Sequence, residues 1–529
     1  MFHRRISLYH HMIGSIALVA VMFAVSAGCS VTPPEPTEPA VGATGDPVLG
    51  GSIRAVQAAE PRGLDPAAMS NTWTTQAFLG NALYGTLLVN DVVSTAVQGS
   101  MASSFETTDG GGTFTLTLRP GVVFSDGSPL DAAAVKFNWD RLRDPATASS
   151  TIAQAGTIAS NEIVDPLTLR STLRSPNPHY AQSVVNSAMN WIASPAALGA
   201  GPEAFNAAPV GAGPYVLESW ARQDVLELVR NPRYWDAPRP YLDAISLRSA
   251  SDTNQRINTA IAGGADVVMD SNWASLAKAR RAGLPVDVVP MGGGQFISMN
   301  HARAPFDDIR ARQAVAMAVN VESLNLAIYN GEGEIPETMF VEESPFHTDT
   351  GMSRYDPDAA RALFDELAAE GKPVKFTFTA ITTVENRANA ESVQAQLSAF
   401  DNVEVDVEVV DFPTGLAKAG ARDFQMMVSA SNIQDPDFGL WTAFHSTSRG
   451  NTTGVVDTEL DRALEVGRFS QSVEERKAAY QIVQERLVAL VPGIYYVRAS
   501  PAAVTGLDIG GVHQYGQGSL LPEELWKAE

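Results

Sequence analysis

A serine and a lysine three residues apart are the first candidates for chemistry in this chain of 529 residues. Ser275 and Lys278 fit the Ser-x-x-Lys pattern of penicillin-recognising enzymes, in which the serine hydroxyl attacks an acyl group. The sequence contains neither the Lys-Thr-Gly segment of that class nor a Gly-x-Ser-x-Gly elbow. We therefore expect no enzyme and no catalytic residue. An exported hydrolase that uses Ser275 and Lys278 stays as the alternative.

Histidines, the commonest protein ligands of transition metals, are scattered along the chain. Three of the eight lie in the first eleven residues, and the sequence contains no His-Glu-x-x-His pair. Glycine-rich segments at 110–112 and 292–294 lack the Lys-Ser/Thr pair that follows in a phosphate-binding loop. The sequence predicts neither a metal site nor a cofactor.

The single cysteine, Cys29, lies directly behind an apolar N-terminal segment. Arg4 and Arg5 precede an apolar run over 12–25, and small residues at 26–28 complete the layout of a secretory signal. One cysteine has no partner for an intramolecular disulfide, whereas this position is that of the lipid-accepting cysteine of bacterial lipoproteins. The run is shorter than the roughly 20 residues that cross a bilayer. We predict a signal peptide over 1–28 and lipidation of Cys29, with plain secretion or a membrane-spanning anchor as alternatives.

The composition excludes two classes of partner. The chain carries 37 basic and 59 acidic residues, a formal net charge of −22, which becomes −24 when Arg4 and Arg5 leave with the signal. Such a charge argues against nucleic acid and against an anionic membrane surface. Four prolines between 33 and 39 are typical of an extended spacer. We predict a lipidated stalk over 29–49 that precedes a globular body.

Alternating strands and helices are predicted for this body. Period-two alternation and apolar residues at i, i+3, i+4 and i+7 are the respective signals. The expected strands lie at 53–56, 113–118, 374–379, 403–410 and 494–497. The expected helices lie at 76–88 and 391–400 and after the N-capping residues Asp131, Asp307–Asp308, Asp356 and Ser472. This order predicts an α/β fold with mixed sheets.

A set of landmark segments resembles the family 5 solute-binding proteins, the oligopeptide, dipeptide and nickel receptors of bacterial ABC importers. The segments follow in the family's order at 83–88, 102–135, 213–215, 230–235, 305–314, 355–357, 435–437 and 457–461. The resemblance implies a two-lobed clamp of the class II periplasmic-binding-protein type. Its lobes close on a ligand and exclude water.

The resemblance also implies the organisation of the chain and its partners. Lobe I would comprise 50–288 and 498–529, with an extra subdomain over 71–206, and lobe II would comprise 290–497. The expected partners are a small solute, by default a short peptide, and an ABC permease. We expect a monomer that is exported and held by Cys29 at the outer face of the cell membrane or in the periplasmic space.

Three segments face the cleft in this family and supply candidate ligand contacts. They are Asn71, Thr72 and Trp73 after the turn at 64–66, Gly294, Gln295 and Phe296 on the first strand of lobe II, and Asn432, Asp435, Phe438 and Trp441 opposite. For Phe438 and Trp441 a place in the core is the alternative, and for Asp435 the alternative is capping of the next turn.

Asn432 bears on the choice of ligand. In the peptide-binding members an aspartate stands four residues before the proline, here Pro436, and pairs with the α-ammonium group of the peptide. An amide is neutral and loses the charge-assisted part of that bond. Arg387 is the candidate partner for a ligand carboxylate, with a surface position as the alternative. A non-peptide solute, such as a sugar or a small organic acid, therefore stays open beside the peptide.

Overall fold

The computed structural model describes residues 40–352 and 355–528. Cys29, the predicted signal peptide and the first part of the predicted stalk lie outside these residues. Within the described residues, every helix is too short or too polar to span a lipid bilayer.

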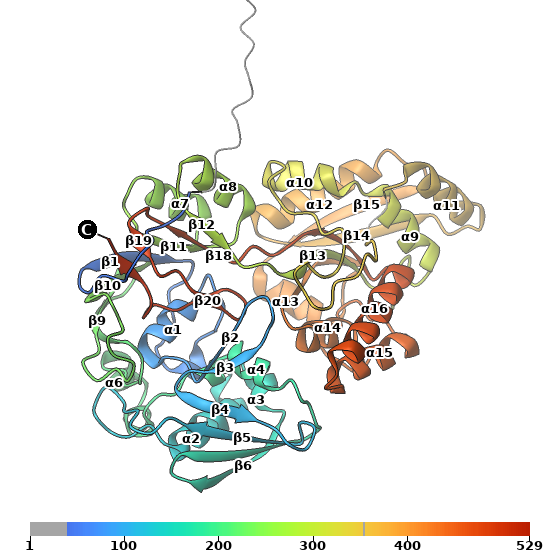
Figure 1. Ribbon diagram of the computed structural model, residues 1–529. Helices are drawn as coiled ribbons and strands as arrows, with labels where there is room; N and C mark the ends of the chain where they lie inside the picture. Colours follow the sequence, from blue (N-terminus) through green and yellow to red (C-terminus); the bar gives the residue numbers. More distant parts are fainter. Residues whose placement is uncertain (1–39, 353–354, 529) are drawn as a thin grey trace, which may run out of the picture. The chain divides into compact units, whose positions relative to one another are not determined.

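A seven-stranded mixed sheet organises the region that we predicted as lobe I (Figure 1). In sheet order its strands are β12 (Val286–Val288), β18 (Ala502–Thr505), β11 (Val267–Asp270), β1 (Ser52–Gln57), β10 (Ala244–Ser249), β9 (Val225–Arg230) and β8 (Tyr215–Ala221). The central strand β1 is parallel to both of its neighbours, and the C-terminal strand β18 is antiparallel to β11 and β12. Strands from both ends of the described chain thus share one sheet. Two helices belong to it, α7 (Thr253–Ile261) and α8 (Trp273–Arg281).

A four-stranded antiparallel sheet forms the core of the predicted extra subdomain. Its strands are β4 (Ala102–Glu106), β5 (Thr113–Leu118), β7 (Thr168–Leu173) and β6 (Ile158–Asp165), in sheet order. Its helices and those beside it are α1 (Ala77–Tyr84), α2 (Ala132–Leu142), α3 (Ile152–Ala155), α4 (Ala181–Val185), α5 (Pro195–Gly199) and α6 (Pro202–Ala207). Phe105 packs against Phe114 and Trp139 at ring-centroid distances of 4.9 and 5.7 Å. The buried Trp139 indole donates to Met189 O at 2.8 Å, which satisfies its one polar atom.

A five-stranded mixed sheet organises the region that we predicted as lobe II. Its strands, in sheet order, are β15 (Val403–Val410), β14 (Val374–Ile381), β16 (Met426–Ile433), β13 (Gly292–Met299) and β17 (Gly493–Val497). Its helices are α9 (Ile309–Ala318), α10 (Val321–Tyr329), α11 (Pro357–Ala369), α12 (Val384–Leu397), α13 (Phe412–Ala421), α14 (Pro436–Phe444), α15 (Thr458–Phe469) and α16 (Val473–Leu490). Three short antiparallel pairs complete the strands: β2 (Leu88–Asn90) with β3 (Val97–Gly99), β19 (Ile509–Gly510) with β22 (Trp526–Lys527), and β20 (Gln514–Tyr515) with β21 (Ser519–Leu520).

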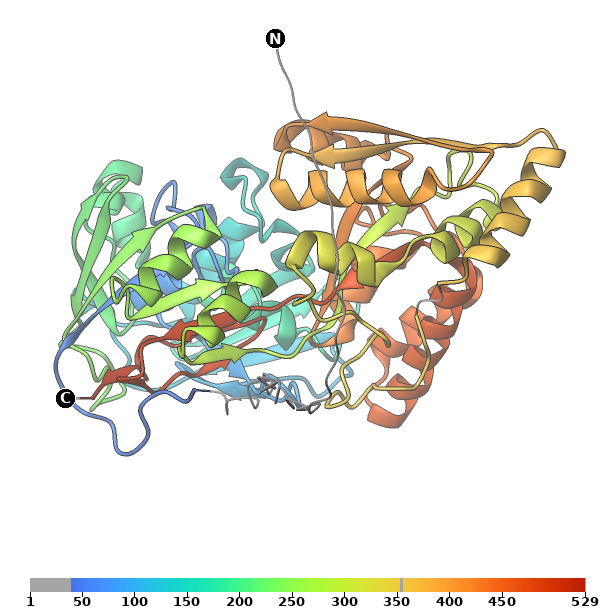
Figure 2. The same ribbon diagram turned by 90° about the horizontal axis from the view of Figure 1, so that it is seen from above.

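The chain passes between the two large sheets at 289–291 and again at 498–501. Both crossings can be followed in Figure 2, the first in yellow-green and the second in red. They lie side by side, because Val289 N donates to Pro501 O at 2.9 Å. We predicted the lobe boundaries at 288–290 and 497–498, and this division stays a prediction. That the two parts move as separate lobes stays a prediction.

The predicted α/β architecture with mixed sheets is confirmed, and most helix starts follow their caps. Asp131, Asp356 and Ser472 each accept a hydrogen bond from an amide in the first turn of their helix. Asp308 rather than Asp307 caps α9, since its carboxylate accepts from Arg310 N.

Two helix boundaries were wrong. The helix expected over 76–88 ends at Tyr84, because Gly85 adopts a positive φ of 65° and the following residues enter β2. The helix expected over 391–400 starts seven residues earlier, at Val384, because Thr383 caps it by accepting from Asn386 N.

Candidate functional site

Two pockets border the segments 70–73 and 428–439, which belong to the regions of the seven-stranded and the five-stranded sheet respectively. One has a volume of about 240 Å³ and the other of about 260 Å³. We call the first the amide pocket and the second the arginine pocket. Consecutive residues line different pockets: Thr72 lines the first and Trp73 the second. The two pockets are therefore neighbours on the same two segments.

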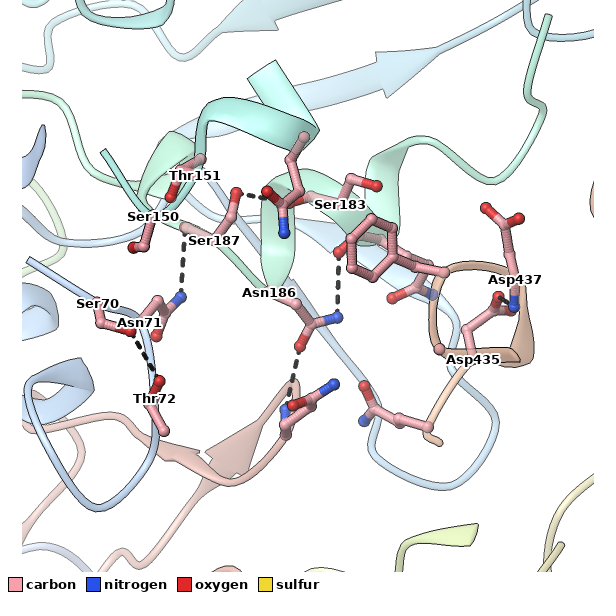
Figure 3. Close-up of a pocket in the computed structure, with 16 residues that line it drawn as sticks. Ser70, Asn71, Thr72, Ser150, Thr151, Ser183, Asn186, Ser187, Asp435 and Asp437 are labelled. Carbon is pink, nitrogen blue, oxygen red and sulfur yellow. Dashed lines mark hydrogen bonds between the residues drawn. The ribbon is translucent and has the colours of Figure 1, made fainter. Parts of the chain in front are cut away.

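The amide pocket is lined mainly by neutral hydroxyl and carboxamide groups (Figure 3). Twelve of its sixteen lining residues are of this kind: Ser70, Asn71, Thr72, Ser150, Thr151, Gln154, Gln182, Ser183, Asn186, Ser187, Gln434 and Gln517. Asp435, Asp437, Phe438 and Gly439, at the start of α14, complete the lining. Carboxamides donate and accept hydrogen bonds at once, and hydroxyls do the same. Such a lining suits an uncharged polar group with both donors and acceptors.

Both carboxylates of the amide pocket already have partners. Asp435 lies 3.0 Å from Arg476 Nη2, with both side chains only 5% exposed, and it caps α14 by accepting from Asp437 N. Asp437 lies 3.3 Å from Arg468 Nε and accepts from Asn177 Nδ2 at 2.8 Å. Burial raises the pKa of the Asp437 carboxyl, and the nearby Arg468 opposes that shift. The capping role of Asp435, our alternative, is thus observed.

Two further predicted contacts of the amide pocket also take part in the local structure. Asn71 donates to Val185 O at 3.2 Å and accepts from Ser519 Oγ at 3.0 Å. Thr72 Oγ1 lies 2.8 Å from Ser70 Oγ. Figure 3 draws this hydrogen bond as a dashed line. Phe438 is 38% exposed, so it lies at the rim and not in the core. A role of these residues in binding stays a prediction.

The arginine pocket is lined by three other predicted contacts, Trp73, Gln295 and Asn432. Gln295 lies on β13, where its Oε1 accepts from Tyr496 OH at 2.7 Å. Asn432 lies on the neighbouring β16 and pairs with Gly293 in the antiparallel ladder. Among the described residues, Trp73 Nε1 and Asn432 Oδ1 are buried atoms without a hydrogen-bond partner. Buried polar groups are mostly paired, so these two atoms are candidates for hydrogen bonds to a ligand. Gln154 Oε1, Gln434 Nε2 and Asp437 Oδ1 of the amide pocket have the same status.

Arg498 is a candidate binding residue that the sequence analysis did not name. It follows β17 at the second crossing and lines the arginine pocket, with a side chain that is 6% exposed. Its main chain is fixed on both sides: Arg498 N donates to Glu334 O at 2.8 Å, and Arg498 O accepts from Trp273 Nε1 at 2.9 Å. The available signal was an arginine placed at the predicted boundary between the lobes.

The Arg498 guanidinium has partners for only part of its donors. Nη2 donates to Thr338 O at 3.0 Å. Nε lies 2.8 Å from Glu334 Oε1 but is poorly aligned for a hydrogen bond, and within the described chain Nη1 has no partner. Burial lowers the pKa of Arg498, with Glu334 opposing the shift, and an arginine stays charged at neutral pH.

Four predicted contacts line neither pocket. Phe296 is 2% exposed and stacks on Tyr495 at 4.9 Å, because it points to the opposite face of β13 from Gln295. Gly294 has a φ of 130°, and a Cβ there would lie 2.2 Å from Val497 O, so a close approach of strands requires the glycine. The other two are Arg387, which is exposed on α12, and Trp441, which stacks on His445 at 3.6 Å.

The hydrolase alternative finds no support in the geometry. Ser275 is 4% exposed on α8, whereas Lys278 on the same helix is exposed and donates to Asn258 Oδ1 at 2.6 Å. A serine nucleophile needs a base within hydrogen-bond reach of its hydroxyl, and this lysine is bonded elsewhere.

Comparison with known proteins agrees with this architecture. Residues 96–451 match the model of the bacterial extracellular solute-binding proteins, family 5. The chain is 30% identical over 455 residues to the glutathione-binding protein GsiB of Pectobacterium atrosepticum, covering 81% of this chain and 84% of that protein.

Two solved structures share the fold. One is the periplasmic binding protein DppA of Helicobacter pylori in complex with the peptide STSA, with a TM-score of 0.76, 21% identity, and coverage of 91% of this chain and 99% of that one. The other is AgaA of Agrobacterium tumefaciens in complex with agropinic acid, with a TM-score of 0.75, 22% identity, and coverage of 90% and 99%. The predicted two-lobed periplasmic-binding-protein fold is confirmed. The matching family and these neighbours are solute-binding proteins and not enzymes. The chain belongs to the family 5 bacterial extracellular solute-binding proteins.

Proposed function

We propose that this chain is a receptor that captures a short peptide in the adjoining amide and arginine pockets and delivers it to an ABC permease. The observation that carries the proposal is the lining of the amide pocket. Residues 70–72 and 434–439, from the regions of the two large sheets, meet there around hydroxyl and carboxamide groups. A peptide offers one N–H and one C=O per residue, which such groups can match along its length.

The relatives support a peptide as the default ligand. The curated relatives are glutathione-binding proteins, and glutathione is itself a peptide derivative. One structural neighbour holds the peptide STSA, another holds agropinic acid. The neutral Asn432 favours a second candidate, a receptor of the same kind for a non-peptide solute such as a sugar or a small organic acid.

Thermal unfolding of the mature chain decides between these ligand classes. The panel contains di- to hexapeptides, glutathione, sugars and small organic acids, each at several concentrations. A ligand at 100 times its Kd adds about 2.7 kcal/mol to the free energy of unfolding, so a true ligand raises Tm clearly. We expect stabilisation by peptides. Stabilisation by sugars or acids together with none by any peptide would contradict the peptide proposal.

We further propose that Cys29 carries the lipid that keeps the receptor beside its permease. Two acyl chains on one cysteine are enough for stable anchoring, and the proline-rich segment behind it would act as the spacer. Labelling of the growing host with a fatty-acid analogue tests this. The full-length protein should incorporate the label and enter the detergent phase, and Cys29→Ala should lose both properties. Labelling that survives Cys29→Ala would contradict the assignment.

A further inference from the structure

We propose that Arg498 and Trp73 bind a free carboxylate of the ligand in the arginine pocket, and that Asn432 accepts a hydrogen bond from an N–H group of the same ligand. The inference rests on the proposed function, because it takes this pocket to receive the transported solute. It names the chemical class of that solute: a compound with one free carboxylate and a nearby N–H donor.

Arg498 carries the inference because it is a buried cation with a donor to spare. Its side chain is 6% exposed, and among the described residues Nη1 has no hydrogen-bond partner. Glu334, the acid beside Nε, is 51% exposed, so solvent screens its charge. A buried guanidinium is stable when carboxylate oxygens meet its N–H groups, frequently two at a time. Beside its pair with Glu334, Arg498 thus keeps an open donor, Nη1, for a ligand carboxylate.

The neighbouring donors and acceptors fit the two ends of an amino-acid-like group. Trp73 Nε1 can only donate, and this buried atom also lacks a partner within the described chain. Asn432 Oδ1 can only accept and is equally unpartnered there. Two open donors call for ligand oxygen atoms, and one open acceptor calls for a ligand N–H. All three residues line the same pocket.

The charge of the pocket selects a carboxylate over a phosphate or a sugar. Arg498 is the only charged side chain among the thirteen described residues that line it. A carboxylate adds a single negative charge beside the Arg498–Glu334 pair, whereas a phosphate dianion would add two in a protein of net charge −22. Neutral sugar hydroxyls would form weaker bonds to the cation than an ionised acceptor does.

Arg387, the carboxylate partner expected from the sequence, serves as the matched control. Arg387 belongs to the region of the five-stranded sheet. It is exposed on α12 and lines neither pocket. R387Q and R498Q replace the same type of side chain and change the net charge by the same amount. The two variants therefore separate binding in the pocket from long-range attraction by a positive charge.

The experiment measures Kd by calorimetry on the mature chain with Cys29→Ser, which keeps the protein free of lipid. The probes are the tightest-binding peptide of the di- to hexapeptide library, its C-terminal amide, and small monocarboxylic acids with their primary amides. We expect amidation to weaken binding to the unmodified pocket about 10- to 100-fold, the cost of one charged hydrogen-bond contact. R498Q should weaken binding of the peptide acid to a similar degree, and W73F should weaken it less. R387Q should leave every Kd unchanged.

The outcomes separate this inference from the proposed function. If peptide acids and amides bind alike, the peptide receptor stands and the carboxylate subsite is overturned. If monocarboxylic acids bind in an Arg498-dependent way and no peptide does, the subsite stands and the peptide proposal fails. If only sugars bind, both fail. The comparison of acid and amide on the unmodified pocket needs no variant, so it decides even if R498Q does not fold.

Discussion

The two pockets differ in the charge of their buried side chains, whereas both contain open polar atoms: Gln154 Oε1, Gln434 Nε2 and Asp437 Oδ1 of the amide pocket also lack a hydrogen-bond partner among the described residues. In the amide pocket the charged groups are paired within the protein: Asp435 with Arg476, and Asp437 with Arg468 and Asn177. In the arginine pocket Arg498 Nη1, Trp73 Nε1 and Asn432 Oδ1 have no partner within the described chain. The amide pocket thus contains two buried carboxylates that are paired with arginines. The arginine pocket contains a buried guanidinium with an open N–H group.

The largest expected effect is on the ion pair behind the amide pocket. R476M leaves the Asp435 carboxylate buried without its cation, and breaking a buried pair in this way costs about 3–5 kcal/mol of the free energy of unfolding. Urea unfolding should show that loss. The matched control is K375A, which breaks the exposed pair with Glu404 and should cost less than about 1 kcal/mol. Equal losses in the two variants would contradict the distinction between buried and exposed ion pairs.

Glu523 extends the comparison to a buried carboxyl without a cation in hydrogen-bond contact. Burial raises its pKa to about 7, from a usual value of 4.5. The unfolded chain therefore loses this proton at lower pH than the folded one, and stability falls as pH rises from about 4.5 to about 7. The loss amounts to at most about 3 kcal/mol. E523Q should flatten this part of the pH profile, and an unchanged slope would refute the assignment.

A charge placed at Asn432 would sharpen the role of the arginine pocket. N432D restores an acid where the peptide-binding members have one, and a carboxylate accepts from an ammonium group about twice as strongly as an amide does. Peptides with a free N-terminus should bind about 5- to 10-fold tighter, and N-acetylated peptides should gain nothing. Calorimetry on both peptides gives the comparison. Equal gains for both would show that Asp at this position acts in some other way.

The smallest effect is expected for a single hydroxyl of the amide pocket. S183A removes one of twelve hydroxyl or carboxamide residues in the lining, and a neutral hydrogen bond contributes about 0.5–1.5 kcal/mol. Peptide affinity should fall by about 2- to 10-fold, without the preference for acid over amide being changed. A loss as large as that of R498Q would show that the two pockets do not divide the binding as we describe.

The sequence predicted the elements better than the site, for physical reasons that particular residues show. N-caps such as Asp131 and Asp356 are local signals, so helix starts could be placed from the sequence. Gly85 ends α1 early, because the glycine adopts a positive φ. The helical spacing of apolar residues continues past it and does not reveal this end. The alternation of a strand also excludes Gln295 and Phe296 from facing the same pocket, a test that the sequence analysis did not apply.

Arg498 could not be chosen from the sequence because its environment is not local. Trp73 lies 425 positions and Asn432 66 positions before it in the sequence, and the fold brings the three residues to one pocket. The sequence analysis instead chose Arg387, a cation within the predicted lobe II, as the partner of a ligand carboxylate. Burial, which depends on the whole fold, separates the two arginines.

A crystal structure of the protein with its tightest-binding peptide tests the central claim most directly. The account predicts one peptide across both pockets, with its carboxylate oxygens within about 3 Å of Arg498 Nη1 and Trp73 Nε1, at hydrogen-bond distance. Its main chain should meet the hydroxyl and carboxamide groups of the amide pocket. A carboxylate bound by Arg387, or a ligand that leaves Arg498 Nη1 without a partner, would contradict it.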